Sequence, residues 1–209
     1  MKKLIYAILA LALIMPAAAS AKTALEKARA KAHKEKLKDY KKDGWKPLGS
    51  KTLELNLLEH YDKLNKLGAD GHEVEGISTR TKSINTGKQM AINNAVITYG
   101  QEAGSTLQGR VVADMSASGT DPDAEFENFF AAYERLVEKE IRGEMEPSFT
   151  ITKDNGDGTM EVRTYFIVEE SSAQKARMRA LEEAMKNSQV AADHAQKISE
   201  FVRQGLDEE

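Results

Sequence analysis

The segment spanning residues 148–168 constrains the fold most, because it has the pattern of a β-hairpin. In its first strand, residues 148–152, Phe149 and Ile151 alternate with Ser and Thr. In its second strand, residues 160–168, apolar residues again recur at alternate positions. The linking sequence Asp-Asn-Gly-Asp-Gly consists of turn-forming residues. One face of the hairpin is therefore apolar and the other polar, which predicts a small antiparallel sheet covered by helices on one side.

Helical patterns surround this hairpin. Apolar side chains recur at helical spacing in four stretches, residues 50–67, 86–103, 121–142 and 173–204. Capping residues mark the four starts, namely Ser50, Thr86, Asp121 and Ser172. Two more strands are expected, over residues 73–84 and 106–115. Because the order of elements lacks a repeated strand-helix-strand rhythm, we expect an α+β fold with a small, mainly antiparallel sheet.

The N-terminus has the composition of a secretory signal peptide. Two lysines precede an uncharged apolar run, and small residues, including Ala19 and Ala21, lead up to Lys22. We expect cleavage after Ala21, which would place the mature chain in the periplasm or outside the cell. A retained membrane anchor is the alternative, but Pro16 and the Ala- and Ser-rich stretch after it dilute the apolar run.

Charge divides the rest of the chain into two parts. Residues 22–47 contain ten Lys or Arg and four Asp or Glu, a net charge of +6, whereas residues 48–209 carry −11. We therefore predict a signal peptide over residues 1–21, a basic helical extension over residues 22–47 and a single α+β domain over residues 48–209. The chain has no cysteine, so neither a lipid anchor on cysteine nor a disulfide is available.

The basic extension carries the candidate binding residues. On a helix, several of its lysines share one flank, where they would meet another cell-envelope component or an anionic envelope surface. The candidates are Lys34, Lys38, Lys41, Lys42 and Trp45. The alternative is a solvated helix packed loosely on its own acidic domain, with Trp45 as a core residue.

Several spacings imitate catalytic or binding motifs without their context. Residues 44–52 are one residue too long for a phosphate-binding loop, and they follow a charged helix instead of a buried strand. Ser172 and Lys175 match one element of penicillin-recognising enzymes, but the partner elements are missing. The turn at residues 154–158 lacks the acidic ends of a calcium loop.

We accordingly predict no catalytic residue, no cofactor and no nucleic-acid partner. The alternative is a metal-dependent hydrolase. Its site would combine His60, Asp70, His72 and Glu73, which are residue types that bind metal ions.

The central region resembles a known family. The run from Lys82 to Ala95, the run from Ala103 to Val111, and Ala132 to Val137 are similar to small bacterial envelope proteins grouped with the twenty-kilodalton lipoproteins. They are also similar to α+β modules of flagellar-ring and envelope-assembly proteins. The resemblance covers residues 73–168 and implies a strand, an Ala-rich helix and a second strand crossing a small sheet. It implies no enzymatic activity, and this chain departs from the family in lacking the lipid-accepting cysteine.

Overall fold

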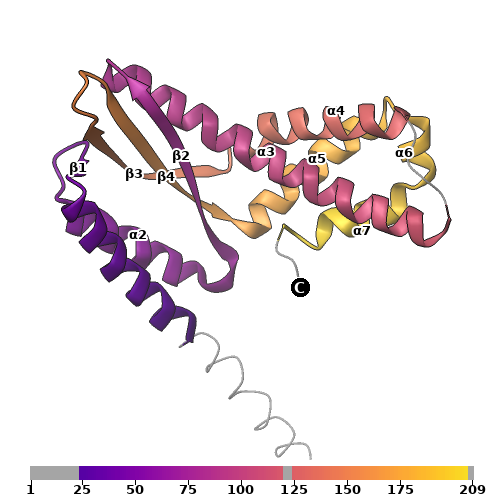
Figure 1. Cartoon of the computed structure of the whole chain (residues 1–209). Coiled ribbons are helices and arrows are strands. Elements are labelled where there is room, and N and C mark those ends of the chain that lie inside the picture. The colour runs from indigo at the N-terminus through magenta and orange to yellow at the C-terminus, as the bar shows by residue number, and fades with distance from the viewer. Residues whose placement is uncertain (1–23, 120–123, 207–209) are drawn as a thin grey trace, which may run out of the picture.

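The molecule has two lobes, a four-stranded sheet and a helical bundle, which share one long helix (Figure 1). The structure is a computed structural model and describes residues 24–119 and 124–206. The strands are β1 (Lys46–Pro47), β2 (Gly71–Thr81), β3 (Met145–Asp154) and β4 (Met160–Glu169). They form one antiparallel sheet in the order β1-β3-β4-β2. The expected hairpin is β3–β4, and the α+β fold class is confirmed.

Both faces of this sheet are buried, whereas the alternating pattern predicted one solvated face. In β4, Tyr165 and Ile167 point to one face and Phe166 and Val168 to the other, and all four are buried. The buried hydroxyl groups on the polar side of the hairpin nevertheless have hydrogen-bond partners, because those of Thr150 and Thr164 lie 3.1 Å apart and bond to each other. A polar strand face can therefore lie under a helix without leaving polar groups unpaired.

Two helices cover the first face. One runs over residues 24–42, and the other is α2 (Leu53–Leu67) (Figure 1). The side chain of Thr52, not Ser50, caps α2 by accepting a hydrogen bond from the Leu55 amide, and a short 3-10 turn (Gly68–Asp70) leads into β2. The core on this face consists of Tyr40, Trp45, Leu53, Leu57, Tyr61, Leu64, Phe149, Ile151, Tyr165 and Ile167. The basic N-terminal segment thus supplies two core aromatic residues and strand β1.

The second face is covered by α3 (Ile84–Ala117), a helix of 34 residues that continues beyond the sheet into the bundle. The prediction of a strand over residues 106–115 is wrong, because α3 includes this whole stretch. Its buried residues Tyr99, Ala103, Leu107, Val111 and Met115 recur every four positions, as on one side of a helix. The strand implied by the family resemblance is therefore also missing here.

Glycines allow α3 to approach its neighbours closely. A Cβ atom at Gly104 would lie 3.1 Å from the Glu134 Cβ, and one at Gly100 would clash with Glu138. Both glutamates belong to α4 (Ala124–Ile141). Gly104, which directly follows the predicted helix over residues 86–103, is instead a helix–helix contact within α3.

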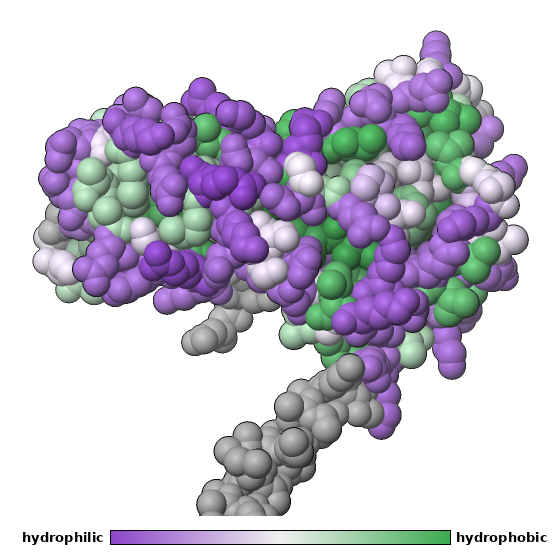
Figure 2. Space-filling view, turned by 180° about the vertical axis from the view of Figure 1, so that it is seen from behind, coloured by the Kyte–Doolittle hydropathy of each residue, from purple (hydrophilic) through white to green (hydrophobic). Residues whose placement is uncertain are grey.

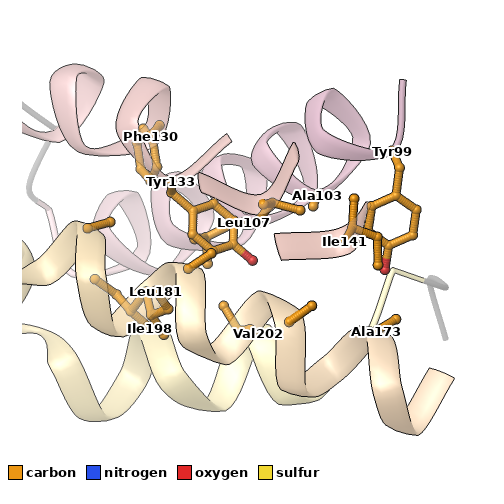
Figure 3. Packing of buried hydrophobic residues seen from close by; sticks show 14 of the residues in the cluster. Tyr99, Ala103, Leu107, Phe130, Tyr133, Ile141, Ala173, Leu181, Ile198 and Val202 are labelled. Atoms are coloured by element: carbon orange, nitrogen blue, oxygen red, sulfur yellow. The ribbon is translucent and has the colours of Figure 1, made fainter. Parts of the chain in front are cut away.

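The bundle is completed by three C-terminal helices where the sequence predicted one. These are α5 (Glu170–Met185), α6 (Gln189–Asp193) and α7 (Ala195–Arg203). Because α5 begins at Glu170, Ser172 lies within its first turn and is not its N-cap. Ser188 caps α6 by accepting a hydrogen bond from the Ala191 amide. The proposed cap at Asp121 lies outside the described residues. Figure 3 shows buried side chains of α3, α4, α5 and α7 converging between these helices.

Candidate functional site

A row of lysines on the helix over residues 24–42 is the most distinctive surface feature of the sheet lobe. Spacings of four and three residues alternate along it, so its members share one helical face. The lysine row comprises Lys27, Lys31, Lys34, Lys38 and Lys41, with Lys42 beside them, and all six are exposed. Four of the sequence candidates, Lys34, Lys38, Lys41 and Lys42, therefore lie together on this surface.

Most of the lysine row is free of acidic partners. Lys41 pairs with Glu54 of α2, and Lys31 lies 3.8 Å from Glu35 in an exposed pair. Lys34 and Lys38 have no ion pair with any of the described residues. Such ammonium groups keep their charge available for a partner.

The opposite side of the same helix is fixed to the body by specific bonds. The Arg29 guanidinium donates hydrogen bonds to the carbonyl oxygens of Leu64, Gly68 and Gly71, the last two at 2.9 Å. These bonds satisfy backbone acceptors at the C-terminal end of α2 and at the first residue of β2. Lys36 forms an ion pair with Glu73 of β2. The helix is therefore not packed loosely, and its docking sets the direction of the lysine row.

A chain of hydrogen bonds ties Tyr40 of this helix to the sheet. The Tyr40 and Tyr165 hydroxyl oxygens are 2.5 Å apart, and the Tyr165 hydroxyl donates to Glu75 at 2.5 Å. Burial raises the pKa of Tyr165, as do its hydrogen bonds to Glu75 and Tyr40, so the phenol remains a donor. Arg163 also donates to Glu75, at 3.2 Å.

Trp45 lies beside this hydrogen-bonded chain and is only 6% exposed. The cationic groups of Lys153 and Arg163 lie 4.9 and 4.6 Å from the centre of its ring. Trp45 is thus a core residue with cations stacked on it, and it does not share the exposed surface of the lysine row.

His60 of α2 is the centre of a second polar cluster on this face. It is fully buried, its Nδ1 lies 2.8 Å from the Ser148 Oγ, and its Nε2 lies 2.6 Å from a Glu73 carboxylate oxygen. The rings of Tyr61, Phe149 and Tyr165 surround it. This connectivity resembles a serine–histidine–acid relay, but the two ring nitrogens are used in the opposite order. Sequence reasoning missed Ser148 and Lys36, because neither is close in sequence to His60 or Glu73.

The four residues of the suggested metal site do not converge. His60 and Glu73 are hydrogen bonded, but the Asp70 carboxylate accepts a hydrogen bond from the Ser171 amide at 3.0 Å. His72 and Glu73 are adjacent in β2, so their side chains point to opposite faces of the sheet. His72 instead lines a cavity of about 190 Å³ with Tyr99 and Glu102. Nowhere in the described ranges do three His, Cys, Asp or Glu side chains meet as a metal site requires.

A buried arginine joins the bundle to the end of the sheet. The Arg177 side chain is 1% exposed, donates to the Tyr99 hydroxyl at 2.5 Å and pairs with Glu170. Burial raises the pKa of Tyr99 to about 12, although the nearby Arg177 acts to lower it. The Arg177 charge is paired with Glu170, although its buried Nε has no hydrogen-bond partner among the described residues, and the cluster holds α3 and α5 together.

Comparisons with protein-family models, with curated proteins and with solved structures find no match to this chain. Within the part of the chain that the structure describes, no helix is both long and apolar enough to cross a membrane. Functional inference therefore depends on the geometry of the lysine row and of the buried polar clusters.

Proposed function

We propose that this protein is a non-catalytic binding module of the cell envelope that contacts an anionic partner through the lysine row. The observation that supports this most directly is the opposed arrangement of the helix over residues 24–42. One side is attached through Arg29, Lys36 and Tyr40, while the other presents six exposed lysines. A rigidly held row of cations is suited to binding a surface with many negative charges.

The magnitude of this attraction is sufficient for reversible binding. Each lysine near an anionic surface contributes on the order of 1 kcal/mol, and the row extends about 22 Å along the helix at 1.5 Å per residue. Residues 48–209 carry a net charge of −11. The acidic body is repelled by the surface that attracts the lysine row, which favours one orientation of the bound protein.

Export is part of the proposal and has its own test. The charged start, apolar run and small residues before Lys22 support removal of the first 21 residues. N-terminal sequencing of protein recovered from the periplasm is expected to begin at Lys22. A product that keeps Met1 and stays in the membrane fraction would contradict the proposed location.

Binding is tested with a quadruple variant and a matched control. Lys34, Lys38, Lys41 and Lys42 are replaced by Gln, and the control replaces four exposed lysines of the bundle, Lys139, Lys175, Lys186 and Lys197. Binding to anionic vesicles and to heparin is measured at low salt and at physiological salt. The row variant is expected to lose most of its low-salt binding, whereas the control keeps it. The difference between the two variants is expected to shrink at physiological salt, where exposed charges act only within a Debye length of about 8 Å. Equal losses in both variants would refute a role for the lysine row.

The cluster around His60 favours hydrolysis at Ser148 as a second candidate function. Ser148 lies at an irregularity in β3 and is partly exposed. Its Oγ is hydrogen-bonded to His60, which is in turn hydrogen-bonded to the Glu73 carboxylate. Full burial of His60 makes the cluster better suited to a structural role, so this candidate ranks second. A fluorophosphonate probe tests it, since labelling that is lost in Ser148→Ala establishes a reactive serine.

A further inference from the structure

Two leucines are exposed on the outer surface of α2, next to the lysine row. Leu58 is 57% exposed and Leu55 41% exposed, and they are one turn apart on the helix. The buried residues Leu53, Leu57 and Leu64 lie on the other side of α2. Figure 2 shows hydrophobic side chains reaching the surface of the sheet lobe among polar ones. An exposed pair of this kind contributes nothing to the core of the protein.

The leucines and the lysine row belong to one continuous surface. The helix over residues 24–42 and α2 lie side by side over the same face of the sheet (Figure 1). They run in opposite directions, because Arg29 binds Gly68 at one end of the pair and Lys41 pairs with Glu54 at the other. Since the inner sides of both helices are buried, the lysines and the leucines emerge on the outer side of the same two-helix layer.

The acidic residues of α2 are already paired. Glu54 pairs with Lys41, Glu59 pairs with Lys51, and Asp62 lies 2.6 Å from Lys66. Around Leu55 and Leu58, the negative charges are therefore balanced within α2 and its neighbour. On the helix over residues 24–42, Glu26 and Asp39 form no ion pair with a described residue, but eight Lys or Arg outnumber three Asp or Glu. The layer as a whole therefore presents cations beside apolar side chains.

We infer that the anionic partner is the surface of a phospholipid bilayer, into which Leu55 and Leu58 insert beside the lysine row. This inference rests on the proposed function. A water-soluble anionic polymer satisfies lysines but gives the leucines no apolar phase to enter. A bilayer satisfies both, because phosphate groups lie at the level of the ammonium groups and the acyl chains begin just below. The outcome is peripheral attachment through one layer of two helices.

Salt separates the two contributions. At about 1 M salt the Debye length is about 3 Å, so the attraction of the lysine row is largely screened, while the contact between leucines and acyl chains persists. The variant with Leu55→Ser and Leu58→Ser is compared with the unchanged chain and with a control. The control carries Met90→Ser and Ile97→Ser, which remove exposed apolar side chains of α3 that are 45% and 39% exposed.

Binding is measured with vesicles of phosphatidylglycerol and phosphatidylcholine and, separately, with heparin. The unchanged chain and the control are expected to keep a salt-resistant fraction of vesicle binding. The leucine variant is expected to lose about tenfold in affinity for vesicles at high salt and to bind heparin as the unchanged chain does. Circular dichroism confirms that all three proteins are folded.

Other results overturn the inference in recognisable ways. If the leucine variant binds vesicles as tightly as the unchanged chain at every salt concentration, or if heparin is bound more tightly than vesicles, the bilayer is the wrong partner and the proposed function stands. If the unchanged chain shows no salt-sensitive binding to either probe, the proposed function fails together with the inference.

Discussion

Gly76 of β2 lies directly beneath α3, and its lack of a side chain sets the distance between sheet and helix. A Cβ atom at this position would come within 1.9 Å of the Ala91 carbonyl oxygen and 2.9 Å of the Ala95 Cβ. Because the nearest atom belongs to the helix backbone, relief requires α3 to move. We expect Gly76→Ala to lower the free energy of unfolding by about 2 to 3 kcal/mol, measured by urea denaturation.

Gly109 provides the matched control for that substitution. It lies in α3, the helix that packs on Gly76, is exposed, and has no atom within 4 Å of the position that a Cβ would occupy. We expect Gly109→Ala to raise stability by about 0.5 to 1 kcal/mol, because alanine favours the helix and restricts the unfolded chain. If both variants lose stability equally, the close packing at Gly76 is not the cause.

Glu73 makes the folding stability of the sheet lobe depend on pH. Burial by itself raises the pKa of Glu73, but the hydrogen bond from His60 and the charge and hydrogen bond of Lys36 outweigh burial and lower the pKa below its usual value of 4.5. A carboxylate with a lowered pKa stabilises the folded state above that usual value, and this stabilisation is lost as the pH falls through the lowered pKa.

The corresponding variant is Glu73→Gln, compared with the unchanged chain by urea denaturation between about pH 7 and pH 3. We expect the variant to be less stable at pH 7 and the difference to narrow as the pH falls below 4.5. If the free energies of unfolding of the two proteins differ by the same amount at every pH in this range, Glu73 is not held by His60 and Lys36 as described.

His60 and Glu73 illustrate what sequence can indicate about such a cluster. Their residue types suggested a shared site, and the structure does bring them together. Ser148 and Lys36 complete the cluster from positions that are 88 and 37 residues away from their respective partners. Contacts between residues so far apart in sequence depend on how the helix over residues 24–42 and strand β3 pack in the sheet lobe. No local sequence pattern predicts this packing.

At the scale of elements, α3 shows where local patterns mislead. Leu107, Val111 and Met115 are separated by four residues, a spacing that fits both one side of a helix and one face of a strand. Gly104 directly follows the predicted helix over residues 86–103, and glycine is the residue type that most often follows the end of a helix. Its real role is to let α4 approach α3, a tertiary contact that only the packed bundle reveals. The prediction of one C-terminal helix was wrong for a different reason. The apolar spacing continues through this region, but the helix is interrupted at residues 186–188 and at His194.

The apolar side of α4, by contrast, was predicted correctly and supports a quantitative test. Phe130 is 4% exposed and packs against Phe126 and Phe129, with ring centres 5.9 and 5.5 Å away. We expect Phe130→Ala to lower the free energy of unfolding by about 3 to 5 kcal/mol, since it removes a buried ring and leaves a cavity. Gln101→Ala, at an exposed site on α3, is expected to change it by less than about 0.5 kcal/mol. A loss below about 1 kcal/mol for Phe130→Ala would mean that the ring is not in the core.

At the scale of the whole molecule, sequence could indicate the charge of the N-terminal segment but not its attachment. Lysine spacing alone was enough to place Lys34, Lys38 and Lys41 on one flank of a helix. The partners of Arg29 and Tyr40 are 35 to 125 residues away in sequence. The hydrogen bonds that attach this segment to the sheet lobe could therefore not be predicted from the sequence. For the same reason, the lysines that precede Trp45 in the sequence suggest a binding residue, whereas the structure places Trp45 in the core.

Because α3 belongs to both lobes, we expect them to unfold together. Its N-terminal half covers the sheet at Ala91 and Ala95, and its C-terminal half supplies Leu107 and Val111 to the bundle. Trp45, the single tryptophan of the chain, reports on the sheet lobe by fluorescence, whereas far-ultraviolet circular dichroism follows the helices. Phe130→Ala weakens only the bundle directly, yet both signals are expected to shift to the same lower urea midpoint and to coincide, as in two-state unfolding. A fluorescence transition that stays at its original midpoint while the circular dichroism transition moves would show that the lobes are independent and that α3 does not couple them.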